Sequence, residues 1–301
     1  RPGDTILTCL AYPVEIRRRK RLPDYEAPQL VPKPAEPGRI VRFDPFWLLV
    51  FTAFGLLMLL IAGKPDPFRR IAVFVLDGLW VTIRITLVSF VLILIAGLIG
   101  GLGRISKNPI IYGLASLYVE VVRGVPLLVQ LIFIYYASPQ LLSAIGRTIA
   151  SAIPSLASPA QVLIGIQLDP FVAAVFGFTI CYGAYMSEIY RAGIESIPKG
   201  QMEAARSLGM SYFQAMRYVI LPQAVRVILP PVGNEFVALL KDSSLVSAVA
   251  VADLTRRGRE FMSNTLLSLE TWTLVALIYL VMTLFAARVV SYTERKMSLG
   301  K

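Results

Sequence analysis

The sequence lacks histidine and contains only two cysteines, Cys9 and Cys181. The absence of histidine excludes histidine-ligated zinc or haem and histidine-based acid–base catalysis. Two cysteines are too few for a metal-binding cluster or a disulfide framework. Charge is also scarce: 16% of the 301 residues are charged, where a soluble domain has about a quarter. These shortages argue against a water-soluble enzyme.

The sequence contains long apolar segments, and its mean hydropathy is +0.66. A helix needs about 20 mostly apolar residues to cross a bilayer. The segments predicted to do so are 46–62, 79–102, 111–136, 170–190, 221–240 and 272–290. Another apolar segment, 149–166, contains two prolines and several serines, which predicts an external loop with short helices. The predicted fold class is an all-α polytopic membrane protein.

The net charge of +11 suggests either nucleic acid or an anionic membrane as a partner. With the N-terminus inside the cell, the predicted cytoplasmic segments hold 20 Lys and Arg residues and the external segments hold eight. Because basic residues collect on the cytoplasmic side, this favours cytoplasmic N- and C-termini. The external cluster Arg256, Arg257 and Arg259 runs against the trend. The charge therefore indicates orientation and contact with membrane lipid, not nucleic acid.

Residues 1–45 differ in kind from the rest of the chain. They contain eight prolines and the five consecutive basic residues 17–21. This composition predicts an extended cytoplasmic tail attracted to anionic lipid. Residues 294–301 are predicted to form a short cytoplasmic tail at the other terminus.

The segment 197–222 predicts two short helices that project into the cytoplasm. Ser196 and Pro198 are typical of a helix start, and Gly209 can end that helix in a left-handed conformation. Ser211 followed by Gln214 is a capping-box pattern for a second helix. The small Ala204–Ala205 face suits insertion into a groove of another protein, while a hairpin with no partner is the alternative.

This segment contains several small and apolar residues at fixed intervals that rarely arise by chance. It reads Glu203-Ala204-Ala205, then Gly209 after three residues, then Val219-Ile220-Leu221-Pro222 after nine. It resembles the cytoplasmic coupling loop of ABC importer permeases, with Val219 where that pattern has Ile. The resemblance implies contact with a separate ATPase subunit. The residues that it assigns to this contact are Glu203, Ala204, Ala205, Gly209, Leu221 and Pro222.

Three further segments, 118–130, 230–236 and 240–245, resemble permeases for polar amino acids of the histidine, glutamine and glutamate type. The resemblance extends over 77–292 and implies a five-span type I permease domain at 77–293, with 46–63 as an extra N-terminal transmembrane helix. It further implies a dimer with an identical or paralogous permease. The other implied partners are two ATPase subunits that hold ATP and Mg, an extracytoplasmic substrate-binding protein and a polar amino acid. The implied location is a prokaryotic inner membrane.

No Gly-x4-Gly-Lys-Ser/Thr phosphate loop occurs in the sequence, so no Walker-type nucleotide site is predicted on this chain. We expect no bound cofactor, no metal site and no catalytic residue. Polar residues within spans are candidates for a translocation path, because charge in hydrocarbon is costly. The candidates are Glu120, Arg123, Asn234, Glu235, Lys241, Asp242, Ser243 and Ser244.

Simpler roles compete with that interpretation. Glu120 and Arg123 share a helical face, as do Glu188 and Arg191, so both pairs fit internal ion pairs as well as a gate. A helix beginning at Pro230–Pro231 and interrupted at 241–244 fits helix packing as well as substrate contact. Gly97 and Gly101 predict a close helix–helix approach.

Two other function classes compete with the importer interpretation. A self-contained, ion-coupled secondary carrier for amino acids needs two related halves with paired interrupted helices, but the sequence has one interrupted region and no repeat. A membrane-anchored regulatory protein would act through the basic tail, which is short beside the permease-like spans. The sequence therefore predicts a membrane subunit of an ATP-driven importer.

Overall fold

The computed structural model describes residues 45–298, and within that range it contains helices, turns and loops but no strand. The predicted basic tail therefore lies outside the described residues, apart from Pro45. The longer helices are α1 (Pro45–Gly63), α2 (Pro65–Ile105), α3 (Pro109–Arg123), α5 (Ser138–Ala152), α7 (Pro170–Glu195), α10 (Leu221–Asp242), α11 (Leu254–Thr265) and α12 (Ser268–Ser298). The shorter elements are α4 (Leu127–Ile132), η1 (Phe133–Ala137), η2 (Pro154–Leu156), α6 (Ala157–Ile164), α8 (Lys199–Ser207), α9 (Tyr212–Ala215), η3 (Met216–Ile220) and η4 (Ser243–Val249).

Among residues 45–298, five helical stretches are long and apolar enough to cross a membrane. They are Phe46–Gly63, Asp66–Ile105, Leu127–Ala152, Pro170–Glu195 and Ser268–Lys296. Four contain a predicted span, and α2 is much longer than the span predicted within it. α10 is helical over the predicted 221–240 but is not one of the five, because charged and amide side chains interrupt its apolar surface.

The predicted span 111–136 is wrong as one continuous helix. α3 ends at Arg123, and α4 begins at Leu127 after Gly124, Val125 and Pro126. Pro126 has no N–H to continue the helix and disfavours a helical conformation at the residue before it. Part of the segment predicted as an external loop belongs to α5, while α6 is one of the short helices expected there.

The most extensive packing in the described chain joins α2 to α7. Ile85 and Ile93 of α2 are buried against α7, where Phe178 and Met186 are also buried. Glycines permit the close approach: a Cβ added at Gly97 would lie 2.5 Å from the Cβ of Met186. The predicted small-residue contact is thus confirmed, and its partner helix is α7.

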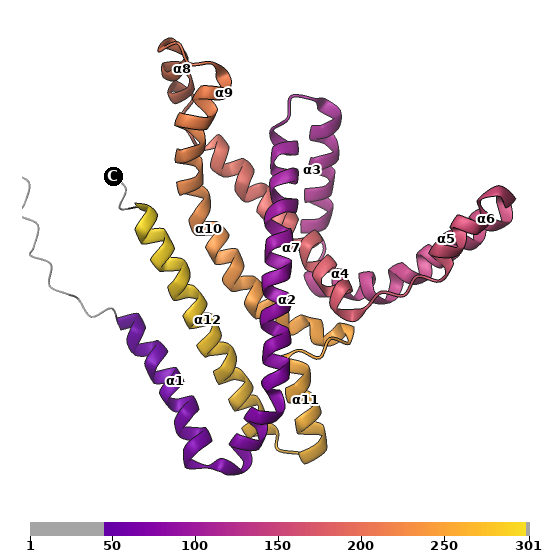
Figure 1. The fold of residues 1–301 in the computed structure, drawn as a ribbon, viewed down its shortest axis with the longest axis vertical. Helices are drawn as coiled ribbons and strands as arrows, with labels where there is room; N and C mark the ends of the chain where they lie inside the picture. Colours follow the sequence, from indigo (N-terminus) through magenta and orange to yellow (C-terminus); the bar gives the residue numbers. More distant parts are fainter. Residues whose placement is uncertain (1–44, 299–301) are drawn as a thin grey trace, which may run out of the picture. The chain divides into compact units, whose positions relative to one another are not determined.

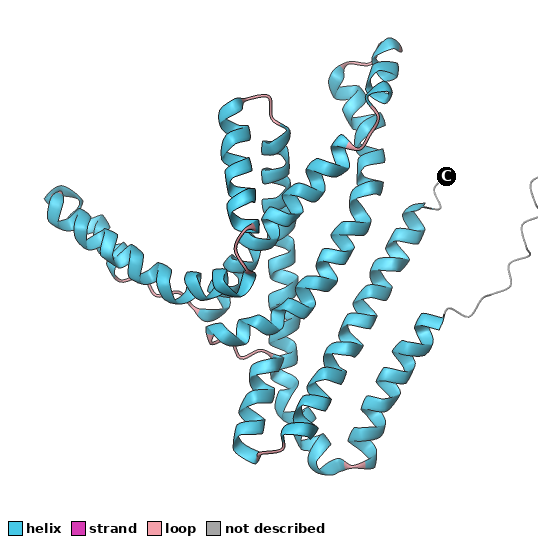
Figure 2. Cartoon of the chain, turned by 180° about the vertical axis from the view of Figure 1, so that it is seen from behind, coloured by secondary structure: helices cyan, strands magenta, loops and turns pink. Residues whose placement is uncertain are grey.

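A second core joins α1 to the start of α2, to α11 and to α12. Its buried side chains include Leu57, Phe68, Ile71, Leu254 and Leu274. α1 therefore packs on the rest of the bundle through this core. Figure 1 shows α1 beside α12, while α8 and α9 stand at the end of α10 remote from α11. Figure 2 shows α5 and α6 packed on each other.

Candidate functional site

The loop after α7 is a well-capped helical hairpin. Gly209 has φ +86°, the left-handed conformation predicted for it. Its N–H donates to the carbonyl of Arg206 at 2.9 Å, and the N–H of Met210 donates to the carbonyl of Ala205 at 3.2 Å. These two bonds form a Schellman motif that ends α8. Backbone hydrogen bonds therefore hold the turn, and its positive φ favours glycine at this position.

The predicted capping box of the second helix is also present. The N–H of Gln214 donates to Ser211 Oγ at 3.3 Å, and the N–H of Ser211 donates to Gln214 Oε1 at 2.8 Å. The predicted N-cap at Ser196 is wrong, because α7 continues to Glu195 and the Ser196 hydroxyl donates to the Gly193 carbonyl. α8 instead starts after Pro198, whose side chain makes no cap hydrogen bond.

Large apolar side chains cover the outer surface of this hairpin. Leu208 is 81% exposed and Phe213 is 75% exposed, and Tyr212 and Tyr218 are also exposed. Of the predicted small pair, Ala205 is buried within the hairpin and Ala204 is on the surface. Glu203, Gly209, Leu221 and Pro222 are exposed as well. Exposed apolar groups on a rigid projection are typical of a protein-binding surface.

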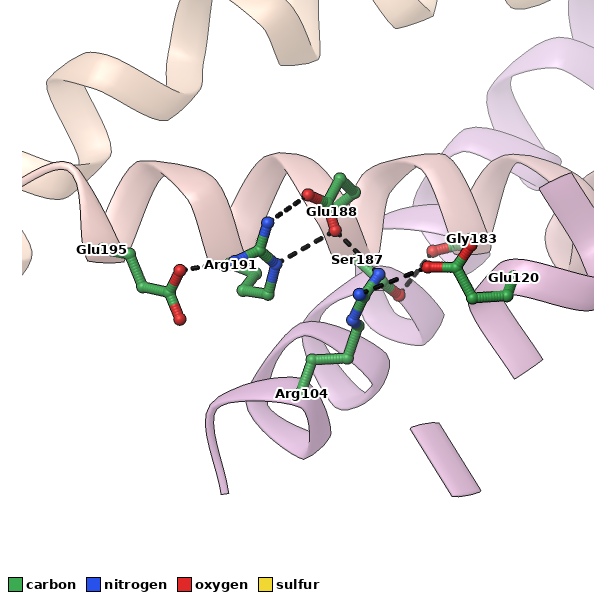
Figure 3. Close-up of polar contacts among 7 residues, drawn as sticks. All are labelled: Arg104, Glu120, Gly183, Ser187, Glu188, Arg191 and Glu195. Atoms are coloured by element: carbon green, nitrogen blue, oxygen red, sulfur yellow. Dashed lines mark hydrogen bonds and ion pairs between the residues drawn. The ribbon is translucent and has the colours of Figure 1, made fainter. Parts of the chain in front are cut away.

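A chain of ion pairs, here called the α7 cluster, joins α2, α3 and α7 near this hairpin (Figure 3). Its members are Arg104, Glu120, Glu188, Arg191 and Glu195. Arg104 lies 2.8 Å from Glu188 and 3.5 Å from Glu120, and Arg191 pairs with both Glu188 and Glu195. The predicted Glu188–Arg191 pair is confirmed.

Arg123 does not pair with Glu120 as their shared face suggested. Its guanidinium lies 5.2 Å from the centroid of the Tyr185 ring, a cation–π contact. Arg123 and Tyr185 line an open groove of about 480 Å³ together with Glu188 and Glu235. Two of the predicted path residues, Arg123 of α3 and Glu235 of α10, are thereby brought to one groove.

The predicted interruption at 241–244 is present, since α10 ends at Asp242 and continues as the 3-10 helix η4. The Tyr182 hydroxyl donates to Asp242 Oδ2 at 2.7 Å, and buried Ser243 donates to the Leu240 carbonyl at 2.7 Å. Lys241 is exposed and Ser244 half-buried. The predicted helix start at Pro230–Pro231 is wrong, because α10 runs through both prolines.

Comparison with known proteins identifies the family. Residues 89–299 match the family described as "Binding-protein-dependent transport system inner membrane component". The chain belongs to this family. It is 36% identical over 224 residues to the glutamine transport system permease protein GlnP of Escherichia coli K12, covering 74% of this chain and 93% of GlnP. It is 40% identical over 189 residues to the L-cystine transport system permease protein TcyB of Bacillus subtilis, covering 63% and 71% of the two chains.

A solved structure described as an amino acid ABC transporter with histidines shares 39% identity. The match covers 74% of this chain and 94% of the chain in that structure, and the TM-score is 0.64. The all-α permease fold and the membership of an amino acid ABC importer family are therefore established for this permease subunit. The family match begins at residue 89, so α1 lies outside it.

At the start of α11 the permease carries a second set of ion pairs, the α11 cluster: Asp77, Arg256, Arg257 and Glu260. Glu260 lies 3.0 Å from Arg256 and 2.9 Å from Arg257, which also pairs with Asp77 of α2. Two of the three arginines that opposed the predicted orientation are thus neutralised locally.

Several residues of these sites were missed by sequence reasoning. Arg104 lies just beyond the predicted span 79–102, and Tyr182 and Tyr185 are not among the predicted path residues. Tyr182 and Tyr185 follow Cys181 by one and four residues, so a search for hydroxyl groups within spans could have found them. No local signal marks the pairing of Arg104 with Glu188, which follows from the packing of α2 on α7.

Proposed function

We propose that this permease moves polar amino acids across the inner membrane of a prokaryote in an ATP-driven importer. The hairpin 197–222 would dock on one of two separate ATPase subunits, which hold ATP and Mg. A second permease subunit, identical or paralogous, would complete the path, and an extracytoplasmic binding protein would deliver the substrate. In this arrangement both described termini of the helical bundle are cytoplasmic.

The capped hairpin is the observation that carries the proposal. Its Schellman turn and capping box make it stiff, and its exposed Leu208 and Phe213 offer an apolar docking surface. The hairpin leads directly into α10, which carries Glu235 to the groove that also contains Arg123. A displacement of the hairpin would therefore reach the groove through one continuous helix.

The groove chemistry suits a zwitterion. Arg123 can attract a carboxylate, and Glu188 and Glu235 can attract an ammonium group. Asp242 lies at the end of α10, where the helix changes to η4, and accepts a hydrogen bond from Tyr182 of α7. These groups add further polarity. We infer that the substrate passes this groove during import.

Copurification and uptake test the proposal together. The double variant Leu208→Ser/Phe213→Ser removes apolar side chains that are already solvated, so the permease should fold and insert normally. We expect the tagged variant to retain the ATPase about tenfold less well than the parent and to lose ATP-driven uptake of labelled glutamine, arginine and cystine in proteoliposomes.

The matched control is Leu266→Ser/Leu269→Ser, which changes two equally exposed leucines beside α11 and at the start of α12. It should keep the ATPase bound. Full assembly and uptake in Leu208→Ser/Phe213→Ser would remove the hairpin from the proposed interface. Uptake by the permease alone, driven by an ion gradient without an ATPase, would instead support a secondary carrier.

A further inference from the structure

An open groove lies between the start of α2 and α11, outside the sites described above. Its volume is about 480 Å³, and the residues that line it are Arg69, Arg70, Val73, Phe74 and Phe261. Phe74 and Phe261 form an aromatic floor, with their ring centroids 5.4 Å apart in an edge-to-face arrangement. Basic side chains therefore border an apolar surface at this end of α2.

The positive charge of Arg69 is available to a ligand. Arg69 is exposed, and within residues 45–298 its guanidinium makes no ion pair, hydrogen bond or ring contact. The same holds for the ammonium group of Lys64, at the N-cap position of α2. Arg70 is different, because it pairs with exposed Asp66 at 3.3 Å. Two uncompensated positive charges are therefore present where α2 begins.

The third arginine beside the groove is already compensated. The Arg257 guanidinium lies 5.8 Å from the centroid of the Phe74 ring, so it covers part of the aromatic floor. It also pairs with Asp77 and Glu260. An incoming anion would therefore be drawn to Lys64 and Arg69 and not to the α11 cluster.

Beyond Arg69, α2 exposes an apolar stripe formed by Val73, Leu76 and Trp80. These residues follow Arg69 at intervals of four, three and four, so all four share one helical face. The three apolar side chains are 69%, 62% and 61% exposed. At 1.5 Å per residue the stripe extends about 16 Å along α2, which is close to half of the ~30 Å hydrocarbon core. Charge followed by one leaflet of apolar surface matches the order of groups in a phospholipid.

We propose that this face of α2 binds an anionic phospholipid, with its headgroup beside Lys64 and Arg69 and an acyl chain along the apolar stripe. Charge disfavours a second copy of the chain, because two such faces would oppose like charges, whereas an anionic headgroup neutralises them. An acidic soluble protein can meet the two charges but not the stripe, which continues into the membrane-spanning part of α2.

The position of the basic residues also calls for a local anion. The turn between α1 and α2 lies at the end of α2 remote from α8 and α9 (Figure 1). In the orientation proposed above this end is extracytoplasmic, where the positive-inside trend does not favour basic residues. An anionic lipid gives Lys64 and Arg69 a role that orientation does not.

The inference is independent of the proposed transport activity. It requires that the bundle lies in a membrane, but it does not depend on the transported substrate or on the ATPase. The site also precedes residue 89, where the family match starts. The lipid site can therefore fail while the proposed function holds, and the reverse is also true.

Trp80 provides a direct probe of the stripe. The chain has three tryptophans, and Trp47→Phe/Trp272→Phe leaves Trp80 as the only one. This full-length variant is reconstituted in nanodiscs that contain brominated phosphatidylglycerol or brominated phosphatidylcholine at equal mole fraction. We expect fluorescence quenching to show about fivefold enrichment of phosphatidylglycerol beside Trp80, and excess inorganic phosphate should not reverse it. Native mass spectrometry of the unsubstituted protein measures lipid retention without the tryptophan changes.

Charge variants test the two basic residues. Lys64→Gln/Arg69→Gln should abolish the preference for phosphatidylglycerol, whereas Lys64→Arg/Arg69→Lys keeps both charges and should retain most of it. The matched control, Lys107→Gln/Arg147→Gln, removes one exposed lysine and one exposed arginine outside the groove and should leave the preference unchanged.

Three results would overturn the proposal. Equal quenching by both lipids would show that this face does not select charge. A preference that survives Lys64→Gln/Arg69→Gln would place lipid selection elsewhere, for example in the basic run 17–21. Protection of Trp80 from both lipids would show that protein covers the stripe.

Discussion

The two ion-pair clusters, which meet α2 at Arg104 and at Asp77, use the same chemistry in different ways. In the α7 cluster, Glu188 is shared by Arg104 of α2 and Arg191 of its own helix, and Arg104 reaches Glu120 of α3 as well. In the α11 cluster, Glu260 is shared by two arginines of its own helix, and only the Arg257–Asp77 pair crosses to α2. The first cluster ties three helices together, whereas the second mainly reinforces one.

Burial adds to this difference. The Arg104 side chain is 11% exposed and has its main partner on another helix, while the Glu260 side chain is 34% exposed beside partners one turn away. Pairs within one exposed helical turn contribute little, but a buried charge that loses its partner is costly. The α7 cluster is therefore the better candidate for contacts that must change when the permease changes state.

The largest expected effect comes from Glu188→Gln. It leaves Arg104 without its closest carboxylate, with only exposed Glu120 nearby, and we expect a loss of about 2–3 kcal/mol in the free energy of unfolding. Uptake should fall strongly. Glu260→Gln is the matched change in the α11 cluster, and it should cost only about 0.5 kcal/mol. Unfolding temperatures in detergent and uptake in proteoliposomes measure the effects of Glu188→Gln and Glu260→Gln. Equal losses of stability and uptake in the two variants would contradict the proposed difference between the clusters.

Glu235→Gln tests whether the groove beside the α7 cluster belongs to the path. The variant keeps the size of the side chain but removes a negative charge from the groove that Arg123 also lines. We expect uptake to fall about tenfold, which corresponds to the loss of one favourable contact of ~1.4 kcal/mol, with normal membrane insertion.

Asn264→Ala is the comparison for the groove beside the α11 cluster, where Asn264 lies with Arg256 and Glu260. It should leave uptake within about twofold of the parent, because surface changes of this kind have small effects. Unchanged transport in Glu235→Gln would exclude that carboxylate from the path.

Gly209→Ala should reduce uptake less than Glu188→Gln or Glu235→Gln does. An alanine at φ +86° costs about 1 kcal/mol or more, so we expect a weaker Schellman turn and a several-fold loss of ATP-driven uptake. Gly200→Ala in α8 is the matched control, because alanine favours a helix and an added Cβ meets nothing within 4 Å there. Stimulation of the ATPase by the permease measures the coupling, and equal stimulation in both variants would argue against a stiff hairpin.

Local features were predictable where the interacting groups lie within a few residues. Gly209, Ser211 and Gln214 predicted both the end of α8 and the start of α9, because helix caps depend on neighbouring backbone groups. Pro126 is a local signal for the break at Gly124–Pro126. The apolar residues on both sides of it nevertheless favoured the prediction of one continuous span. At Ser196, continued packing of α7 outweighed a local preference for a helix start.

Contacts between distant segments were not predictable from residue patterns. Arg104 and Glu188 are separated by 84 positions, and their pairing depends on the glycine-lined approach of α2 to α7. The same packing explains why Glu120 pairs with Arg104 and not with Arg123. Path candidates could be selected as polar residues in apolar segments, but which of them meet at one groove depended on the packing of α3, α7 and α10.

The smallest expected effect concerns pH at the start of α11. Asp253 is fully buried, and burial raises its pKa, although hydrogen bonds from the N–H groups of Arg256 and Thr255 lower it. Because the folded-state pKa lies above the unfolded value, the ionised carboxylate costs stability at neutral pH, and this cost is relieved as the pH falls through the raised pKa. Asp253→Asn keeps an effective N-cap but cannot titrate. From neutral to mildly acidic pH, the unfolding temperature should rise slightly more for the parent than for Asp253→Asn. Glu260→Gln is the control, and introducing it into both proteins should leave this difference between them unchanged. Identical pH profiles for the parent and Asp253→Asn would show that the hydrogen bonds fully offset the burial of this carboxylate.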